Sequence, residues 1–347
     1  MVDNATPSSN VRNIEPDPSG DLVLILGDPS EQTYIRVSSK ILSIASPVLA
    51  AMLGPKYAEG NTLSTTGSLE LTLPEDDPEA MVWVCNIVHL KQSFTHISVA
   101  LMEKIAVTCD KYDMSGALSV WGEAWLSHID LSTDGEARYG RLLWIAYALG
   151  CQTVFYNKSY NMIWYHTEAE LRLMKEDWKG TSIPEDVLKA IMKQRKGALK
   201  RIFTAIDALI APFVRTKCHY SEEHSNKEAC FHLAETGHFF QELLRCKLWP
   251  FFGDWTDRHL EQTATNLGTF KEYLGDFNSG TYYCTSSKRN FLPQMKPIAE
   301  QARKEKLGLC LNCIKQGKIT TKDGNCSASR IEECVTNIRD IEANEVE

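Results

Sequence analysis

The spacing of apolar residues predicts a small sheet within the first third of the chain. Asp21 to Gly27 is mostly Leu, Val and Ile and ends in turn-forming residues, which predicts a strand buried on both faces. Tyr34 to Ser38 and Leu69 to Leu73 alternate apolar and polar positions, so each predicts a half-buried strand. Between and after these segments the apolar spacing becomes helical. The pattern therefore predicts a sheet combined with helices.

Helix starts are marked by capping residues. Ser46-Pro47 and Asp77-Pro78 each place a cap residue directly before a proline, which is favoured at the first helical position. A further helix is predicted to start at Ser38-Ser39, and Gly54-Pro55 is predicted to end the helix that starts at Pro47. The apolar spacing then predicts one helix over about residues 98 to 118.

The chain after about residue 128 is predicted to be mainly helical. Residues 141 to 174 are rich in Trp, Tyr and Leu, and we interpret these aromatic side chains as a helical core. Residues 218 to 246 and 284 to 334 are rich in Cys or His and are predicted to be loop-like. Residues 1 to 20 are predicted to be a disordered tail, because they are polar and contain three prolines.

Residues 185 to 210 predict a strongly amphipathic helix. Such a charged face is usually solvated, and binding of an acidic partner, nucleic acid or an anionic membrane is the alternative. The residues assigned to the basic face are Lys189, Lys193, Arg195, Lys196, Lys200 and Arg201.

Composition narrows the functional classes. Of the 347 residues, 43% are hydrophobic and 24% are charged, which is close to the average of globular proteins. The formal net charge is −8, which disfavours general binding of polyanions, so we expect no specific nucleic acid. The chain has eleven cysteines, an odd number, and they are scattered along the sequence, so no disulfide framework is predicted. No signal-like or membrane-spanning apolar run is found, so we expect an intracellular protein, cytoplasmic or nuclear, without a membrane partner.

The predicted order of elements in residues 21 to about 118 resembles a BTB/POZ domain. Asp21 stands at the start of the first strand, and Ile41-Leu42 and Ser46-Pro47-Val48-Leu49 match an apolar pair followed by Ser-Pro in that family. Tyr57-Ala58-Glu59 and Lys111-Tyr112-Asp113-Met114 match two further family motifs. The resemblance implies an α+β fold, with a BTB/POZ domain over 21–128, a helical region over 129–215 and a Cys/His-containing mixed helical region over 216–340.

Two features depart from the family pattern. Ser38-Ser39 stands where the family has His followed by Lys or Arg, and the segment before Asp21 lacks an evident additional strand. In several dimeric members the basic residue lies near the strand aspartate, so the departure argues against a dimer of that type.

The remainder resembles the C-terminal region of BTB proteins from filamentous fungi. The resemblance implies an interaction role and little else. The residues that carry it are Ala148-Leu149-Gly150 with Phe155, Ile183-Pro184-Glu185, Cys218 with Cys230, Leu248-Trp249-Pro250, and Gly308 to Cys313.

Three residues are candidates for protein interaction. The resemblance implies that Tyr57 and Glu59 contact a cullin-type ubiquitin ligase scaffold, as an aromatic anchor beside a carboxylate. The alternative is an ordinary loop between a helix and a strand. Asp21 is either part of a dimer interface or a strand-start residue that accepts backbone hydrogen bonds. The second role is favoured, because Ser39 supplies no basic partner for Asp21.

The spacing of Cys310 and Cys313 is the one most typical of a metal site. Zinc takes four ligands in a tetrahedral array, and this pair supplies two. Cys218 and Cys230 are weaker candidates for the other two. Buried free cysteines act as small apolar residues, so we expect no cofactor, with a structural zinc ion as the alternative.

The predicted function is that of a non-enzymatic adaptor or scaffold. Its partners would be proteins, either a second copy of the chain or a cullin scaffold. A transcription-related regulator assembled through the BTB domain is the second alternative, and an enzyme of unknown class is the third. No phosphate-loop, dinucleotide-binding, nucleophile-elbow or zinc-protease motif is present, so no catalytic or cofactor-binding residue is predicted.

Overall fold

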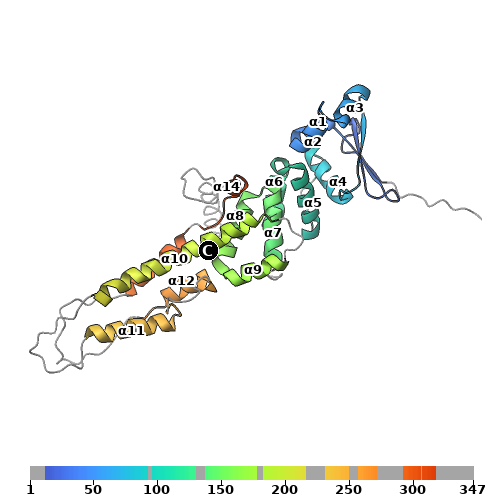
Figure 1. The fold of residues 1–347 in the computed structure, drawn as a ribbon. Coiled ribbons are helices and arrows are strands. Elements are labelled where there is room, and N and C mark those ends of the chain that lie inside the picture. The colour runs from blue at the N-terminus through green and yellow to red at the C-terminus, as the bar shows by residue number, and fades with distance from the viewer. Residues whose placement is uncertain are drawn as a thin grey trace, which may run out of the picture. The chain divides into compact units, whose positions relative to one another are not determined.

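A computed structural model of the chain describes residues 12–92, 96–129, 137–177, 183–215, 231–249, 257–271, 292–305 and 307–317. The chain forms two compact units. The first unit comprises residues 1–156, 180–183 and 310–347, and the second comprises 157–179 and 184–309. A small sheet near the N-terminus and many helices make the fold mixed, as the α+β prediction requires (Figure 1).

The sheet in the described residues has four strands, β1 (Arg12–Ile14), β2 (Leu22–Leu26), β3 (Thr33–Val37) and β4 (Leu69–Leu73), in the order β1-β3-β2-β4. Strands β2 and β3 are antiparallel, whereas β2 and β4 are parallel. Alternate residues of β2 are fully buried and those between them are half-buried. The prediction of burial on both faces of this strand is therefore wrong for the second face.

For residues 12–20, strand β1 corrects the prediction of a disordered tail without an additional strand, whereas residues 1–11 lie outside the described residues. It pairs in parallel with β3, with Arg12 opposite Thr33 and Ile14 opposite Ile35. Pro16 and Gly20 are buried, and a Cβ on Gly20 would collide with the carbonyl oxygen of Val37. Backbone pairing at a sheet edge does not require an apolar pattern, which is why the short sequence Arg-Asn-Ile gave no signal.

The predicted helix starts are confirmed. Helix α1 (Ser39–Ala45) is capped by Ser38 and α2 (Pro47–Met52) by Ser46, whose Oγ accepts the Leu49 N–H at 3.0 Å. Helix α4 (Pro78–Val88) is capped by Asp77, whose Oδ1 accepts the Ala80 N–H at 2.9 Å. Each proline occupies the first turn, where its missing N–H costs no hydrogen bond.

Two helix predictions need correction. Helix α3 (Ala58–Thr66) was not predicted, because its run of Asn, Ser and Thr is typical of a loop. The single helix predicted over 98 to 118 is divided into α5 (Val99–Tyr112) and α6 (Ser115–Ser127). The division occurs at Asp113, which ends α5 in a left-handed conformation with φ at 49°. Aspartate tolerates this conformation better than most residues.

Polar side chains connect the helices of the first unit to one another. His89 Nδ1 lies 2.8 Å from the Cys85 carbonyl oxygen, and the Ser38 N–H donates to His89 Nε2 at 3.1 Å. With Nε2 accepting the Ser38 N–H, Nδ1 is the ring nitrogen placed to donate to the Cys85 carbonyl oxygen. This buried ring therefore connects the end of α4 to the start of α1.

Helices α7 (Ala137–Leu149) and α8 (Gln152–Tyr165) follow α6 in the sequence. Glu123 of α6 accepts the Thr153 N–H at 2.8 Å and so caps the start of α8. Burial raises the pKa of the Glu123 carboxyl, although the hydrogen bonds from the start of α8 oppose this effect. The prediction of an aromatic helical core is confirmed for Trp144, Phe155, Tyr156 and Trp164, which are buried, whereas Tyr165 is exposed.

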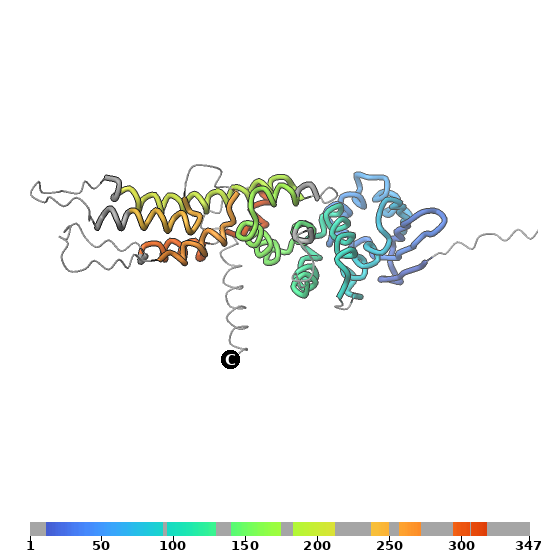
Figure 2. Tube along the Cα trace, turned by 90° about the horizontal axis from the view of Figure 1, so that it is seen from below, coloured from blue at the N-terminus to red at the C-terminus, as the bar shows by residue number. Residues whose placement is uncertain are grey.

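The second unit is helical in its described part. Helix α10 packs against α12 and α13, and these helices run beside one another in Figures 1 and 2. Helices α11, α13 and α14 correct the prediction of loop-like structure at these positions. The bounds are α9 (Glu168–Asp177), α10 (Glu185–Arg215), α11 (Phe231–Arg245), α12 (Leu260–Gly268) and α13 (Leu292–Lys304), and α14 (Leu311–Lys315) belongs to the first unit.

Among the described residues, none of the helices has both the length and the apolar composition needed to cross a membrane.

Candidate functional site

Asp21 is bound to Ser39 within the same chain. Its Oδ1 accepts the Ser39 N–H at 2.8 Å and its Oδ2 accepts the Ser39 hydroxyl at 2.7 Å. Partial burial disfavours the charged carboxylate, but the hydrogen bonds from Ser39 outweigh it and lower the pKa of Asp21. Asp21 thus accepts a backbone hydrogen bond, which is the second of the two roles predicted for it.

Tyr57 and Glu59 lie at the N-terminal end of α3. Tyr57 is the residue before the first turn and is 52% exposed, and Glu59 lies half-buried within that turn. Among the described residues neither side chain has a hydrogen bond or an ion pair. Glu59 belongs to a helix rather than to the ordinary loop considered from the sequence, and its charge suits the positive end of the helix dipole.

The position of these two side chains depends on close backbone packing. Gly60 is buried, and a Cβ at this residue would collide with the carbonyl oxygen of Gly54. The start of α3 therefore lies directly against the turn that ends α2. Glycine at 60 permits this approach and fixes where Tyr57 and Glu59 project.

Cys310 and Cys313 lie at the start of α14. Cys310 is buried and forms an apolar cluster with the buried Tyr156, and the partly buried Cys313 packs against this cluster. Among the described residues, no group of three or more Cys, His, Asp or Glu side chains could hold a metal ion. Cys218 and Cys230 lie outside the described residues. Within the described part of the chain, the predicted pair supplies two of the four ligands that the zinc alternative requires.

The other buried thiols of the first unit are poorly suited to nucleophilic chemistry. Burial raises the pKa of Cys85 and of Cys109 to about 12. It also raises the pKa of Cys151. Because the thiolate is the reactive form, these three side chains stay protonated near neutral pH. They act as small apolar residues of the core.

The predicted basic face of α10 is smaller than the sequence indicated. Arg195 is 1% exposed, and its Nε donates to the His166 carbonyl oxygen at 2.7 Å. Arg201 is paired with Glu305, with Nε 2.7 Å from Oε1. Lys193, Lys196 and Lys200 are exposed, and no interaction of their side chains is seen within the described residues. Assigning Arg195 to the charged face was wrong.

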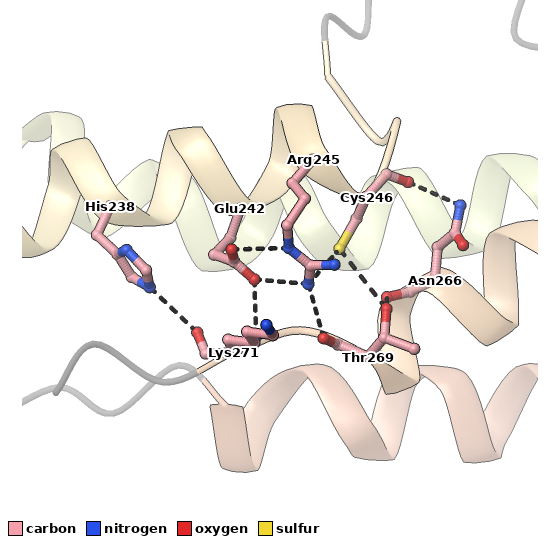
Figure 3. Close-up of polar contacts among 7 residues, drawn as sticks. All are labelled: His238, Glu242, Arg245, Cys246, Asn266, Thr269 and Lys271. Carbon is pink, nitrogen blue, oxygen red and sulfur yellow. Dashed lines mark hydrogen bonds and ion pairs between the residues drawn. The ribbon is translucent and has the colours of Figure 1, made fainter.

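A group of polar side chains joins the end of α11 to the residues that follow α12 (Figure 3). The Glu242 carboxylate accepts hydrogen bonds from Arg245 Nε at 2.8 Å and from the Lys271 N–H at 2.8 Å. The same arginine donates to the Thr269 carbonyl oxygen at 2.7 Å. The hydrogen bonds from Arg245 lower the pKa of Glu242 despite its burial. Since its groups bind one another, this cluster stabilises the second unit.

A surface pocket of about 670 Å³ lies in the first unit. Residues of α1, of the end of α4 and of the start of α6 make up most of its lining. Two of the lining residues, Ile44 and Leu90, are 78% and 91% exposed. The lining residues are Ile41, Ile44, Ala45, Pro47, Ile87, Val88, Leu90, Asp113, Ser115, Gly116, Ala117 and Trp121.

This pocket could not be predicted from the sequence. Its lining residues come from three segments between residues 41 and 121, and a pattern within one helix does not reveal how separate helices meet. One local signal was present, because Leu90 occupies the second position after α4, where glycine is usual. The second local signal was Ile44, an apolar residue on the exposed side of α1.

A scan against protein-family models and a search of curated proteins both returned no match for this chain.

Proposed function

We propose that residues 21–128 form a BTB/POZ-like interaction module and that the protein is a non-enzymatic adaptor or scaffold. The order of the strands and helices from β2 to α6 is compatible with the resemblance stated above. We also propose that a cullin-type ubiquitin ligase scaffold is the partner of the module.

The observation that carries the proposal is the exposure of Tyr57 beside Glu59 at the start of α3. Large aromatic side chains contribute most of the binding energy in many protein interfaces when they enter a pocket of the partner. A carboxylate next to the aromatic ring suits a partner surface with a basic group. Neither side chain has a hydrogen bond or an ion pair within the described part of the chain, so partner binding breaks no contact of this kind there.

The test is capture of a purified cullin scaffold by the full chain and by the Tyr57→Ala and Glu59→Ala variants. Loss of an aromatic anchor commonly costs about 2 kcal/mol or more, so we expect Tyr57→Ala to weaken capture by at least roughly thirtyfold. Glu59→Ala should weaken it less, because a half-buried charge is partly screened by solvent.

Glu70→Ala is the matched control, since Glu70 is an exposed carboxylate on β4 of the same unit. It should capture cullin as well as the wild type does. Equal recovery of cullin by the wild type, Tyr57→Ala and Glu59→Ala would refute this contact surface. Failure of the wild-type chain to capture cullin would refute the choice of partner.

A further inference from the structure

The pocket of the first unit combines an apolar lining with two large exposed aliphatic side chains. Ile44 belongs to α1, and Leu90 is the second residue after the end of α4. Both side chains line the pocket. In the sequence, α2, α3, β4 and α4 lie between these two residues. Exposed apolar residues gathered around one concavity are typical of a binding surface, whereas single ones are common everywhere on a protein.

The backbone at Leu90 indicates that stability does not explain this residue. Its φ is 58°, and the Lys91 N–H donates to the Asn86 carbonyl oxygen at 2.8 Å around it. This is the left-handed end of a helix, where glycine fits without strain and leucine does not. Leucine at this position is therefore unfavourable both for its backbone conformation and for its exposure in the unbound chain.

Asp113 gives the pocket its polarity. It is the one charged residue among those lining the pocket in the described structure, and it is exposed. Within the described residues its carboxylate has neither a hydrogen bond nor an ion pair. A carboxylate at the edge of an apolar surface favours an occupant that carries a cation beside apolar side chains.

We infer that this pocket binds an amphipathic helix of a partner protein. The helix places two apolar side chains, one turn apart, against Ile44 and Leu90, and a Lys or Arg beside Asp113. The inference rests on the proposed function, since it requires the first unit to be an interaction module. It adds a second surface, built from residues other than Tyr57 and Glu59.

The lining favours a helix over an added strand. Its residues lie mostly in α1, α4 and α6, whose backbone groups are bonded within their own helices. A strand would need unpaired backbone donors and acceptors from the pocket, whereas a helix brings its own hydrogen bonds and contributes side chains alone. Anionic occupants such as nucleic acid or a phospholipid surface are disfavoured by the carboxylate of Asp113.

A second copy of the chain is also a poorer occupant. In a symmetric dimer the same surface would face itself. Asp113 is the one charged lining residue in the described structure, so a second copy of this surface would bring a carboxylate and no cation.

The test selects peptides of about 15 residues, a length near the lower limit for a helix in water, from a displayed library on the full chain. We expect the enriched peptides to share an apolar pair at positions i and i+4 together with a Lys or Arg. Ile44→Asp should weaken their binding by at least about tenfold. Val107→Asp is the control, because Val107 is 57% exposed on α5 and does not line the pocket.

Two further variants separate binding from folding. Asp113→Lys should weaken the selected peptides and, in a repeated selection, enrich peptides carrying Glu or Asp instead of Lys or Arg. Leu90→Gly should weaken binding by about fivefold or more while leaving the chain at least as stable as the wild type, because glycine relieves the strained backbone.

Four results would overturn the inference. They are the failure of any peptide to enrich, unchanged binding by Ile44→Asp, no change of charge preference in Asp113→Lys, and a dimer that Ile44→Asp converts to a monomer. Failure here is distinguishable from failure of the proposed function. Ile44→Asp should leave cullin capture intact, and Tyr57→Ala should leave peptide binding intact.

Discussion

Single polar side chains connect parts of the first unit that are far apart in sequence. The Ser46 hydroxyl donates to the Tyr112 carbonyl oxygen at 2.6 Å, and the Tyr112 hydroxyl donates to Asp76 at 2.7 Å. His89 binds the backbone of Ser38, and Asp21 binds both donors of Ser39. These buried or half-buried groups all have partners, as folded proteins require, and each partner fixes where a helix begins or ends.

Asp21→Asn should make stability less dependent on pH. The pKa of Asp21 is lowered in the folded chain, so its carboxylate contributes stability above the unfolded pKa of about 3.9, and this contribution is lost as the pH falls through the folded value. We expect the variant to lose about 1–2 kcal/mol at pH 7, because a hydrogen-bonded charge is replaced by a neutral amide. Urea unfolding measured from pH 7 down to about pH 3 tests this, and the difference should shrink toward acid pH.

Asp28→Asn is the matched control, since Asp28 is an exposed aspartate in the turn between β2 and β3. Its stability should match that of the wild type at each pH. An Asp21→Asn variant as stable as the wild type at pH 7 would show that the contact with Ser39 contributes little to folding.

Elements whose ends depend on adjacent residues could be predicted from the sequence. The caps at Ser46 and Asp77 combine with the following prolines to fix α2 and α4 locally. Elements that depend on distant partners could not be predicted in this way. Strand β1 exists because β3 lies beside it, and α3 is stable because Gly60 allows its backbone to approach Gly54.

The packing of α6 against the end of α7 and the residue before α8 depends on a glycine. A Cβ at Gly122 would collide with Cys151 Sγ and would lie 2.9 Å from Leu149 Cδ1. Gly122→Ala should therefore lower the free energy of unfolding by about 1–3 kcal/mol, as overpacking of a core does. Urea denaturation of the full chain measures this change.

Gly116→Ala on the same helix is the control for this substitution. A Cβ there meets no atom within 4 Å, so alanine should be neutral or stabilise the chain by about 0.5–1 kcal/mol through its better helix propensity. Equal stabilities of the two variants would mean that α6 can move away from Cys151 at little cost.

The second unit shows what a periodic pattern can reveal about burial and what it cannot. Residue 195 lies on the buried stripe of α10, one turn after Ile191 and one turn before Ala198 and Leu199. The periodicity alone would have placed it in the interior, but its charge led to its assignment to the surface. The carbonyl groups that accept its hydrogen bonds come from segments about 29 and 63 residues away in sequence, which no local pattern shows.

Arg195→Ala should destabilise the second unit specifically. The substitution removes the donors to the carbonyl oxygens of His166 and Arg258 and leaves both oxygens without this donor, which should cost about 3 kcal/mol. Arg195→Lys should not restore stability, because an ammonium group lacks the fork of donors that reaches both oxygens. Lys193→Ala, an exposed change on the same helix, should stay within about 0.5 kcal/mol of the wild type.

Hydrogen exchange followed by mass spectrometry should show faster exchange in α9, α10 and α12 of the Arg195→Ala variant, with α4 and α5 of the first unit unchanged. An equal increase in both units would show instead that the two units unfold together.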